Sequence, residues 1–487
     1  MASDLKKKSV SGMLWTTIER FTTQGIQFVI GIFIARILMP GDYGIIGMLA
    51  IFMAIAQSFL DSGFASALIQ KKDRTENDYS TVFYFNLVVA VLLYALFYVS
   101  APWIAGFYKI PILSDVARVT SLSLILNGLT IVQTAKLTID LNFKFQAIAS
   151  IVSVVLSGMV GILMAYNGYG VWALVWQGIM AALVRLVVLW LASSWRPKLI
   201  FSMDSFRILF SFGSKLLCSG MINTIYQNIY TIVIGKAFGA SDVGYYNRGN
   251  QFASIPTDTT TAIVTKVNFP ILSSLQDDNE KLLQAYRKML RIPLFALFPL
   301  LTGLIALAHP LVEFVLGEKW LPCVPILQIL CLGCMWSPMT HINLNLLYVK
   351  GRSDLVLKLE LVKKPIAFLL LFALLPFGIL WMCVGRALYF FIAFSMNCYY
   401  THKILGYGFS KQIREISFIL LNCAVMWGVV TLCISFATSL VIKLAIGLLT
   451  GALSYTLIAY FANDSSLQDI RQIIEDKIQV RKRLHQQ

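Results

Sequence analysis

Polar side chains recur at helical spacing inside otherwise apolar stretches of this 487-residue chain. They are Glu19, Thr23 and Gln27 in one stretch, and Lys215, Ser219, Asn223 and Gln227 in a later one. Residues four apart lie on one face of a helix, so each stretch presents one polar stripe. Such a stripe either hydrogen-bonds to a neighbouring helix or lines a cavity, and the matching phase of the two stripes favours a cavity lining.

Ionisable side chains also lie deep in the apolar stretches, where cations outnumber anions. The cations are Arg20, Arg118, Lys215, Arg248, Lys266 and Arg386, and the anions are Glu19, Asp61 and Asp258. Such groups are rare at membrane depth unless they face a cavity or a partner. Arg20 and Lys266 lie nearer the ends of their stretches, where long side chains reach the headgroup layer. A cleft lined by the remaining cations, with Gln251 beside Arg248, indicates an anionic cargo.

The composition places the chain in a membrane. Hydrophobic residues make up 58% and charged residues 13%, and the mean hydropathy is +0.74. The apolar runs have the length of helices that cross a hydrocarbon core of about 30 Å, and strand-type alternation is absent. We therefore predict an all-α integral membrane protein. About fourteen spans are expected, at residues 11–36, 43–70, 79–101, 113–135, 145–166, 169–194, 208–235, 244–270, 286–309, 322–348, 355–376, 379–400, 413–434 and 439–462.

Lysine and arginine gather before the first span, in every second loop and in the tail. The basic groups are Lys6 to Lys8, Lys71/Lys72/Arg74, Lys144, Arg196/Lys198/Arg207, Lys281/Arg287/Lys288, Lys350/Arg352, Lys403/Lys411/Arg414 and Arg481 to Arg483. An excess of positive charge marks cytoplasmic loops, so both termini are predicted to be cytoplasmic. The net charge of +16 therefore reflects basic residues in cytoplasmic loops. Because the topology accounts for the charge, nucleic acid is not expected as a partner.

The chain repeats itself at an offset of about 200 residues. The stretch IARILMPGDYGIIGML at 34–49 matches IGKAFGASDVGYYNRG at 234–249, with Asp42 over Asp242 and Gly44 over Gly244. Glycine at this turn is expected to relieve crowding between closely packed helices. Six spans separate the copies, so the two halves run in the same direction, as in transporters with parallel repeats.

The repeat predicts the domain organisation. We expect an N-terminal six-helix lobe at 1–200, a second six-helix lobe at 201–405, two additional spans at 406–464 and a basic cytoplasmic tail at 465–487. Two like-oriented lobes around a central cleft can open it to either side in turn, which is the layout of a transporter.

Several motifs resemble one transporter family. They are ARILMPGDYGIIGM, DSGFASALIQKK, STVFYFNL, IGKAFGASDVGYYNRGNQ and LGEKW, which occur in this order between residues 35 and 320. They are similar to those of the polysaccharide transport family, which includes Wzx-type flippases and belongs to the multidrug/oligosaccharidyl-lipid/polysaccharide exporter (MOP) superfamily. The resemblance covers nearly the whole chain, from about Leu14 to the last span.

The resemblance implies a function. Such a protein moves undecaprenyl-pyrophosphate-linked oligosaccharide from the cytoplasmic to the outer leaflet of the bacterial inner membrane, for the biosynthesis of surface polysaccharide or lipopolysaccharide. Family members are thought to bind the pyrophosphate through cleft cations, a role that Arg118, Lys215, Arg248 and Arg386 match by type and placement. The expected partners are the lipid-linked cargo and membrane lipids. No cofactor is expected; coupling to Na⁺ or H⁺, with Asp61 and Asp258 as candidate residues, and the oligomeric state stay open.

Two other functions compete with this interpretation. A multidrug cation antiporter of the same superfamily would favour carboxylates in the cleft, whereas this chain has an excess of cations. A membrane-embedded glycan polymerase or ligase would need a large external loop, and the longest outward loop predicted here covers only about 102–112. We therefore expect a transporter rather than an enzyme.

The alternation of basic loops makes the topology testable. In a cysteine-free background, single cysteines at Asn167, Ser241 and Lys319 should react with a membrane-impermeant thiol reagent added to intact cells. Cysteines placed at Arg74, Lys198 and Arg352 should react only after the cells are opened. The reversed pattern would contradict the predicted orientation.

Overall fold

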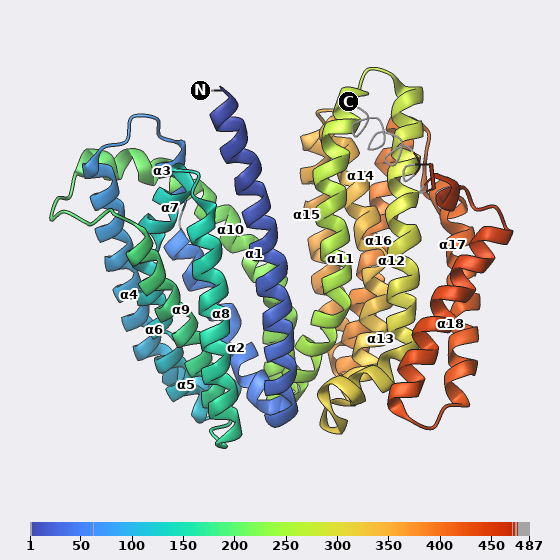
Figure 1. Ribbon diagram of the computed structural model, residues 1–487, viewed down its shortest axis with the longest axis horizontal. Coiled ribbons are helices and arrows are strands. Elements are labelled where there is room, and N and C mark those ends of the chain that lie inside the picture. The colour runs from blue at the N-terminus through green and yellow to red at the C-terminus, as the bar shows by residue number, and fades with distance from the viewer. Residues whose placement is uncertain (1, 62, 470, 473–474, 476–487) are drawn as a thin grey trace, which may run out of the picture. The chain divides into compact units, whose positions relative to one another are not determined.

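The computed structural model shows a chain built from long helices, which within each part of the molecule run side by side (Figure 1). It describes residues 2–61, 63–469, 471–472 and 475, and the side chains of these residues except 2–10, 208, 211–220 and 222–223. Within these residues there are helices and connecting turns but no strand, which confirms the all-α class.

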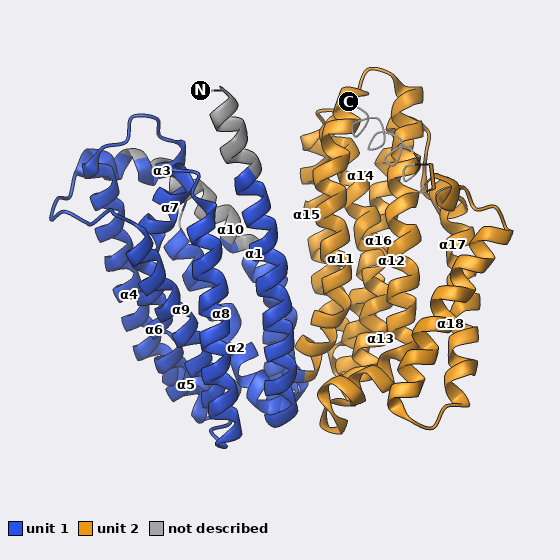
Figure 2. Ribbon diagram, viewed as in Figure 1, with its two compact units in different colours: residues 1–244 blue, residues 245–487 orange. Residues whose placement is uncertain are grey.

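The chain divides into two compact units, residues 1–244 and residues 245–487 (Figure 2). Unit 1 holds α1 (Ala2–Ile37), α2 (Pro40–Asp61), α3 (Phe64–Gln70), α4 (Glu76–Tyr108), α5 (Ile112–Thr120), α6 (Leu122–Gly128), α7 (Ile131–Ile139), α8 (Phe143–Tyr166), α9 (Val171–Ala192), α10 (Met203–Ala237) and the first turn of α11 (Ala240–Ser274). Unit 2 holds the rest of α11, then α12 (Asn279–Leu316), η1 (Glu318–Trp320), α13 (Cys323–Cys334), α14 (Ser337–Val349), α15 (Ser353–Leu374), η2 (Leu375–Phe377), α16 (Ile379–Leu405), α17 (Phe409–Ser435) and α18 (Leu440–Phe461).

Each predicted span falls on one helical segment. Ten segments of the described chain are long and apolar enough to cross a membrane. Three of these are interrupted and consist of α2 with α3, α5 to α7, and α13 with α14. The other four predicted spans fall on α1, α10, α11 and α15. The protein is therefore a multi-pass membrane protein.

Local sequence explains where several helices begin. Thr75 and Asp78 form a capping box at the start of α4, where the Asp78 carboxylate accepts hydrogen bonds from the Thr75 backbone (2.8 Å) and the Lys71 ammonium (2.7 Å). At the start of α12, Asp278 accepts from the backbone N–H groups of residues 280 and 281, both at 3.1 Å. These carboxylates satisfy N–H groups that have no partner within the helix.

The internal repeat reappears in the packing. In unit 1, α8 packs against α9 and α4 against α5, and in unit 2 their counterparts pair in the same way, α15 with α16 and α12 with α13. The fourth span of each half is interrupted, at residues 121 and 129–130 in the first half and at 335–336 in the second. The packing of α10 does not follow the repeat. This helix opens the second copy of the repeat, but it packs on α2, α3 and α4 within unit 1. The predicted lobe boundaries, which rest on the repeat, stay a prediction.

The two copies of the repeated turn pack on each other. A Cβ atom added to Gly44 would lie 1.6 Å from the Ala240 carbonyl oxygen, and one added to Gly244 would lie 2.1 Å from the Pro40 carbonyl oxygen. Pro40 and Ala240 are equivalent positions of the repeat, so the contact is reciprocal, like that across a two-fold axis. The glycines are required because backbone meets backbone, rather than because each turn is crowded by its own helices.

This contact predicts the effect of added methyl groups. Gly44→Ala and Gly244→Ala should each destabilise the fold by about 1–3 kcal/mol or more, because the backbone that they meet cannot rotate away. Folded yield in detergent, measured by size-exclusion chromatography, checks this. Gly41→Ala is the matched control, since its Cβ would meet only the Ser241 hydroxyl at 3.4 Å. Full yield of either Gly44→Ala or Gly244→Ala would contradict the reciprocal contact.

Candidate functional site

A polar cavity of about 480 Å³ lies within unit 1 among α1, α2, α5, α6, α8 and α9. Its wall includes the first predicted polar stripe, Glu19, Thr23 and Gln27 of α1. The other polar residues on the wall are Thr120, Ser123, Asn127, Ser150, Ser153 and Arg185. Four helices thus contribute polar side chains in addition to α1, and the stripe faces hydroxyl and amide groups.

A second cavity, of about 490 Å³, adjoins the first. Asn127 and Arg185 line both, and we call the two together the unit-1 chamber. The other polar residues around the second cavity are Gln57, Asp61, Thr130, Thr134 and Thr138. Asp61, a candidate for ion coupling, therefore shares the chamber with an arginine.

Hydrogen bonds fix the side chains of the unit-1 chamber. The Ser150 hydroxyl donates to the Glu19 carboxylate at 2.5 Å, which joins α8 to α1. The Asn127 amide donates to the Gln57 carbonyl at 3.1 Å, and the Gln57 amide donates to the Asp61 carboxylate at 3.0 Å. This chain of bonds orients both amides, so the chamber presents a fixed pattern of donors and acceptors.

Arg185 is a site residue that the sequence analysis missed. It is a lone arginine in α9, about two turns before the end of the helix, and it was passed over because it lies in a strongly apolar stretch. A signal was present: Gly178, Ala182 and Arg185 are spaced by four and three residues, which places them on one helix face. Small residues on that face leave room for a cavity, and all three line it.

In unit 2, the two predicted cleft arginines are held by neighbours. Arg248 of α11 donates to the Gln251 side-chain carbonyl at 2.7 Å, and its guanidinium lies 5.8 Å from the centre of the Trp320 ring. Arg386 of α16 donates to the Tyr246 hydroxyl. Asp258, the second ion-coupling candidate, lies within electrostatic reach of Arg386. Contacts with aromatic faces and hydrogen bonds offset the hydration that each guanidinium group loses.

The remaining predicted residues lie elsewhere. Arg118 of α5 donates to the Tyr98 backbone carbonyl at 3.3 Å and lies 3.8 Å from the Asp115 carboxylate, and it does not line the unit-1 chamber. Gln227 is exposed on α10. Lys215 and Asn223 also belong to α10, but their side chains lie outside the described residues. Binding of cargo by any of these residues stays a prediction.

The helical membrane fold, its internal repeat and its polar chamber define a membrane transporter. Residues 33–325 match the model of a family described as polysaccharide biosynthesis protein. The match covers more than half of the chain, and the chain belongs to this family. The resemblance of the motifs to polysaccharide transport proteins is thereby confirmed.

Curated relatives extend the match to at least 90% of the chain. The chain is 29% identical over 459 residues to the teichuronic acid biosynthesis protein TuaB of Bacillus subtilis (strain 168), covering 93% of this chain and 95% of TuaB. It is 27% identical over 454 residues to the lipopolysaccharide biosynthesis protein WzxC of Escherichia coli (strain K12), covering 90% and 89%.

Two solved structures share the fold. The lipid II flippase MurJ, in an inward closed conformation, superposes with a TM-score of 0.75 at 17% identity, over 93% of this chain and 99% of MurJ. An inward-facing multidrug resistance MATE family transporter of the MOP superfamily superposes with a TM-score of 0.59 at 14% identity, over 81% and 98%. Because flippases and drug transporters share this fold, the cargo has to be argued from the site.

The hydrogen-bond chain in the unit-1 chamber yields a stability prediction. Gln57→Leu removes both of its bonds and should lower the free energy of unfolding by about 1–3 kcal/mol, because the partner amide and carboxylate lose their partners. Thermal unfolding in detergent measures the loss. The matched control is Gln24→Leu, at an exposed position of α1. Equal unfolding temperatures for the two variants would show that the chain of bonds contributes nothing.

Proposed function

We propose that the protein is a flippase that moves undecaprenyl-pyrophosphate-linked oligosaccharide across the bacterial cytoplasmic membrane by alternating access, for surface polysaccharide biosynthesis. The observation that carries this proposal is the unit-1 chamber, in which serine, threonine, asparagine and glutamine line the wall together with Arg185 and the carboxylates of Glu19 and Asp61. Hydroxyl and amide groups both donate and accept hydrogen bonds, as the hydroxyls of sugars do. The planar guanidinium fork of arginine matches phosphate oxygens.

The family and the relatives support the same class of cargo. The names of TuaB and WzxC refer to teichuronic acid and lipopolysaccharide, and the name of the flippase MurJ refers to lipid II. Proteins similar to this chain thus handle large saccharides or their lipid-linked precursors. A chamber of fixed hydroxyl and amide groups suits a saccharide better than an apolar pocket would. The protein moves this cargo without changing it chemically. Both termini of the chain lie in the cytoplasm.

One observation favours the alternative of a multidrug cation antiporter. Glu19 and Asp61 both line the unit-1 chamber, and carboxylates bind cationic drugs. Both carboxylates accept hydrogen bonds from neutral side chains, however, and Arg185 brings a positive charge to the same chamber. We therefore assign these carboxylates to coupling with Na⁺ or H⁺ rather than to the cargo.

The amount of exported polysaccharide measures how far the arginines contribute to cargo binding. Arg→Gln at 118, 185, 248 or 386 should weaken cargo binding by roughly ten- to a hundredfold, because each charge-assisted bond contributes about 1.5–3 kcal/mol. Arg→Lys should be intermediate, since lysine keeps the charge but loses the planar fork. The readout is surface polysaccharide in a flippase-deficient host that carries each variant, normalised to the amount of membrane protein.

Arg414→Gln provides the matched control, since Arg414 is exposed near the start of α17. It should export like the wild type. Normal export by all four Arg→Gln variants would contradict the proposed cargo site. The antiporter, with Glu19, Asp61 and Asp258 as its working residues, would then be the better account.

A further inference from the structure

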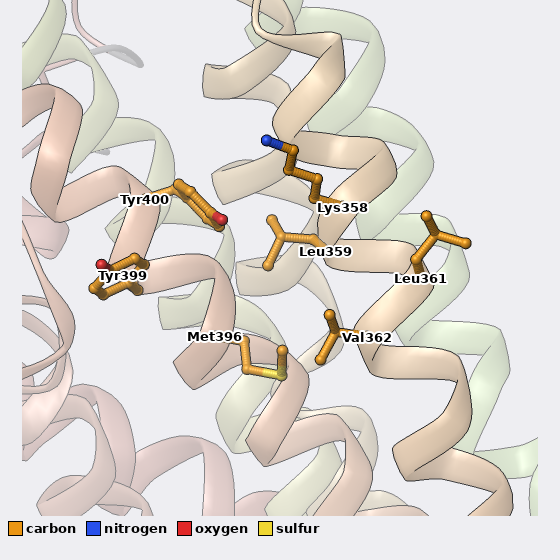
Figure 3. Close-up of a pocket in the computed structure, with 7 residues that line it drawn as sticks. All are labelled: Lys358, Leu359, Leu361, Val362, Met396, Tyr399 and Tyr400. Carbon is orange, nitrogen blue, oxygen red and sulfur yellow. The ribbon is translucent and has the colours of Figure 1, made fainter.

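A groove of about 500 Å³ runs along the surface of unit 2 between α15 and α16 (Figure 3). Its lining, which defines the α15–α16 groove, is Lys358, Leu359, Leu361, Val362, Met396, Tyr399 and Tyr400. Lys358 and Tyr400 project into the space between the two helices from opposite sides (Figure 3). None of these residues belongs to the unit-1 chamber, and the proposed transport function does not use them.

The groove is polar at one end and apolar at the other. Lys358 lies five residues after the first residue of α15, roughly 7.5 Å along the axis at 1.5 Å per residue. Val362 lies nine residues from that end of α15, and Met396 lies nine residues from the last residue of α16, so both are roughly 13.5 Å deep. The apolar wall therefore begins at Leu359, next to the lysine, and Val362 and Met396 extend it about one helical turn deeper.

Aromatic and basic groups gather at the polar end. The Lys403 ammonium lies 4.7 Å from the centre of the Tyr399 ring, and the Tyr400 ring also borders the groove. Lys350 and Arg352 lie in the loop before α15 and Lys411 lies in the first turn of α17, and the positive-inside pattern places all three on the cytoplasmic side. Tyrosine and lysine at this depth are typical of the boundary between headgroups and acyl chains.

We infer that the α15–α16 groove binds an anionic phospholipid of the cytoplasmic leaflet. One acyl chain lies along Leu359, Val362 and Met396, and the phosphate lies between the ammonium groups of Lys358 and Lys403. Basic pockets between membrane helices on the cytoplasmic side bind anionic headgroups in this way. The lysines, which are hydrated point charges rather than planar forks, suit a headgroup that stays in contact with water.

Native mass spectrometry of the full chain, purified in detergent and mixed with equal amounts of phosphatidylglycerol and phosphatidylcholine, tests the inference. The wild type should retain phosphatidylglycerol in preference. Lys358→Gln with Lys403→Gln should reduce that preference by about fivefold for each lysine removed. Val362→Trp, at an exposed position of the apolar wall, should lower the retention of both lipids by filling the groove.

The matched control is Lys72→Gln with Lys198→Gln, which removes two exposed lysines of unit 1 from the same predicted side of the membrane. It should keep the wild-type preference at an equal unfolding temperature. Equal retention of phosphatidylglycerol by the two double variants would overturn the inference. So would displacement of the lipid by an equal amount of undecaprenyl phosphate, which would assign the groove to the cargo. A dimer that Val362→Trp dissociates would overturn it as well, because a second copy of the chain would then fill the groove.

Discussion

The cost of placing polar and ionisable groups in an apolar interior constrains the whole molecule. A charge at membrane depth is retained only when a cavity, an opposite charge or a hydrogen bond compensates it. The structure shows this compensation repeatedly: Arg386 donates to Tyr246, Glu19 accepts from Ser150, and the buried Lys363 lies 2.6 Å from the Glu360 carboxylate. Such groups lie on helices outside the ten long apolar segments, such as Glu19 on α1, and also on helices within them, such as Arg386 on α16. Compensation by neighbours therefore allows ionisable groups in strongly apolar helices as well.

The internal repeat adds a second constraint, on the backbone. Gly44 and Gly244 bring equivalent turns into contact without side chains between them, so each half of the repeat limits which residues the other half can carry at this point.

Local features of the sequence were predicted well, and features that depend on tertiary neighbours were not. All fourteen spans fell on helices because length and hydropathy act within one segment. The shared face of Glu19, Thr23 and Gln27 followed from helical spacing, and they do line one cavity. Their neighbours Asn127, Ser150 and Arg185 come from three other helices, and no spacing along the chain reveals that these helices meet. The contacts of α10 with α2, α3 and α4 were missed for the same reason, since they join segments far apart along the chain.

We propose that the protein recognises a phosphate-linked saccharide rather than a cation. The most direct measurement is transport by the wild-type chain in proteoliposomes, with a fluorescent undecaprenyl-pyrophosphate-linked oligosaccharide in one leaflet and a cationic dye as the competing cargo. We expect the lipid-linked saccharide to cross to the other leaflet, an analogue lacking the pyrophosphate to cross far more slowly, and the dye neither to cross nor to compete. Transport of the dye, together with equal rates for the two lipid-linked saccharides, would contradict recognition of the phosphate-linked saccharide.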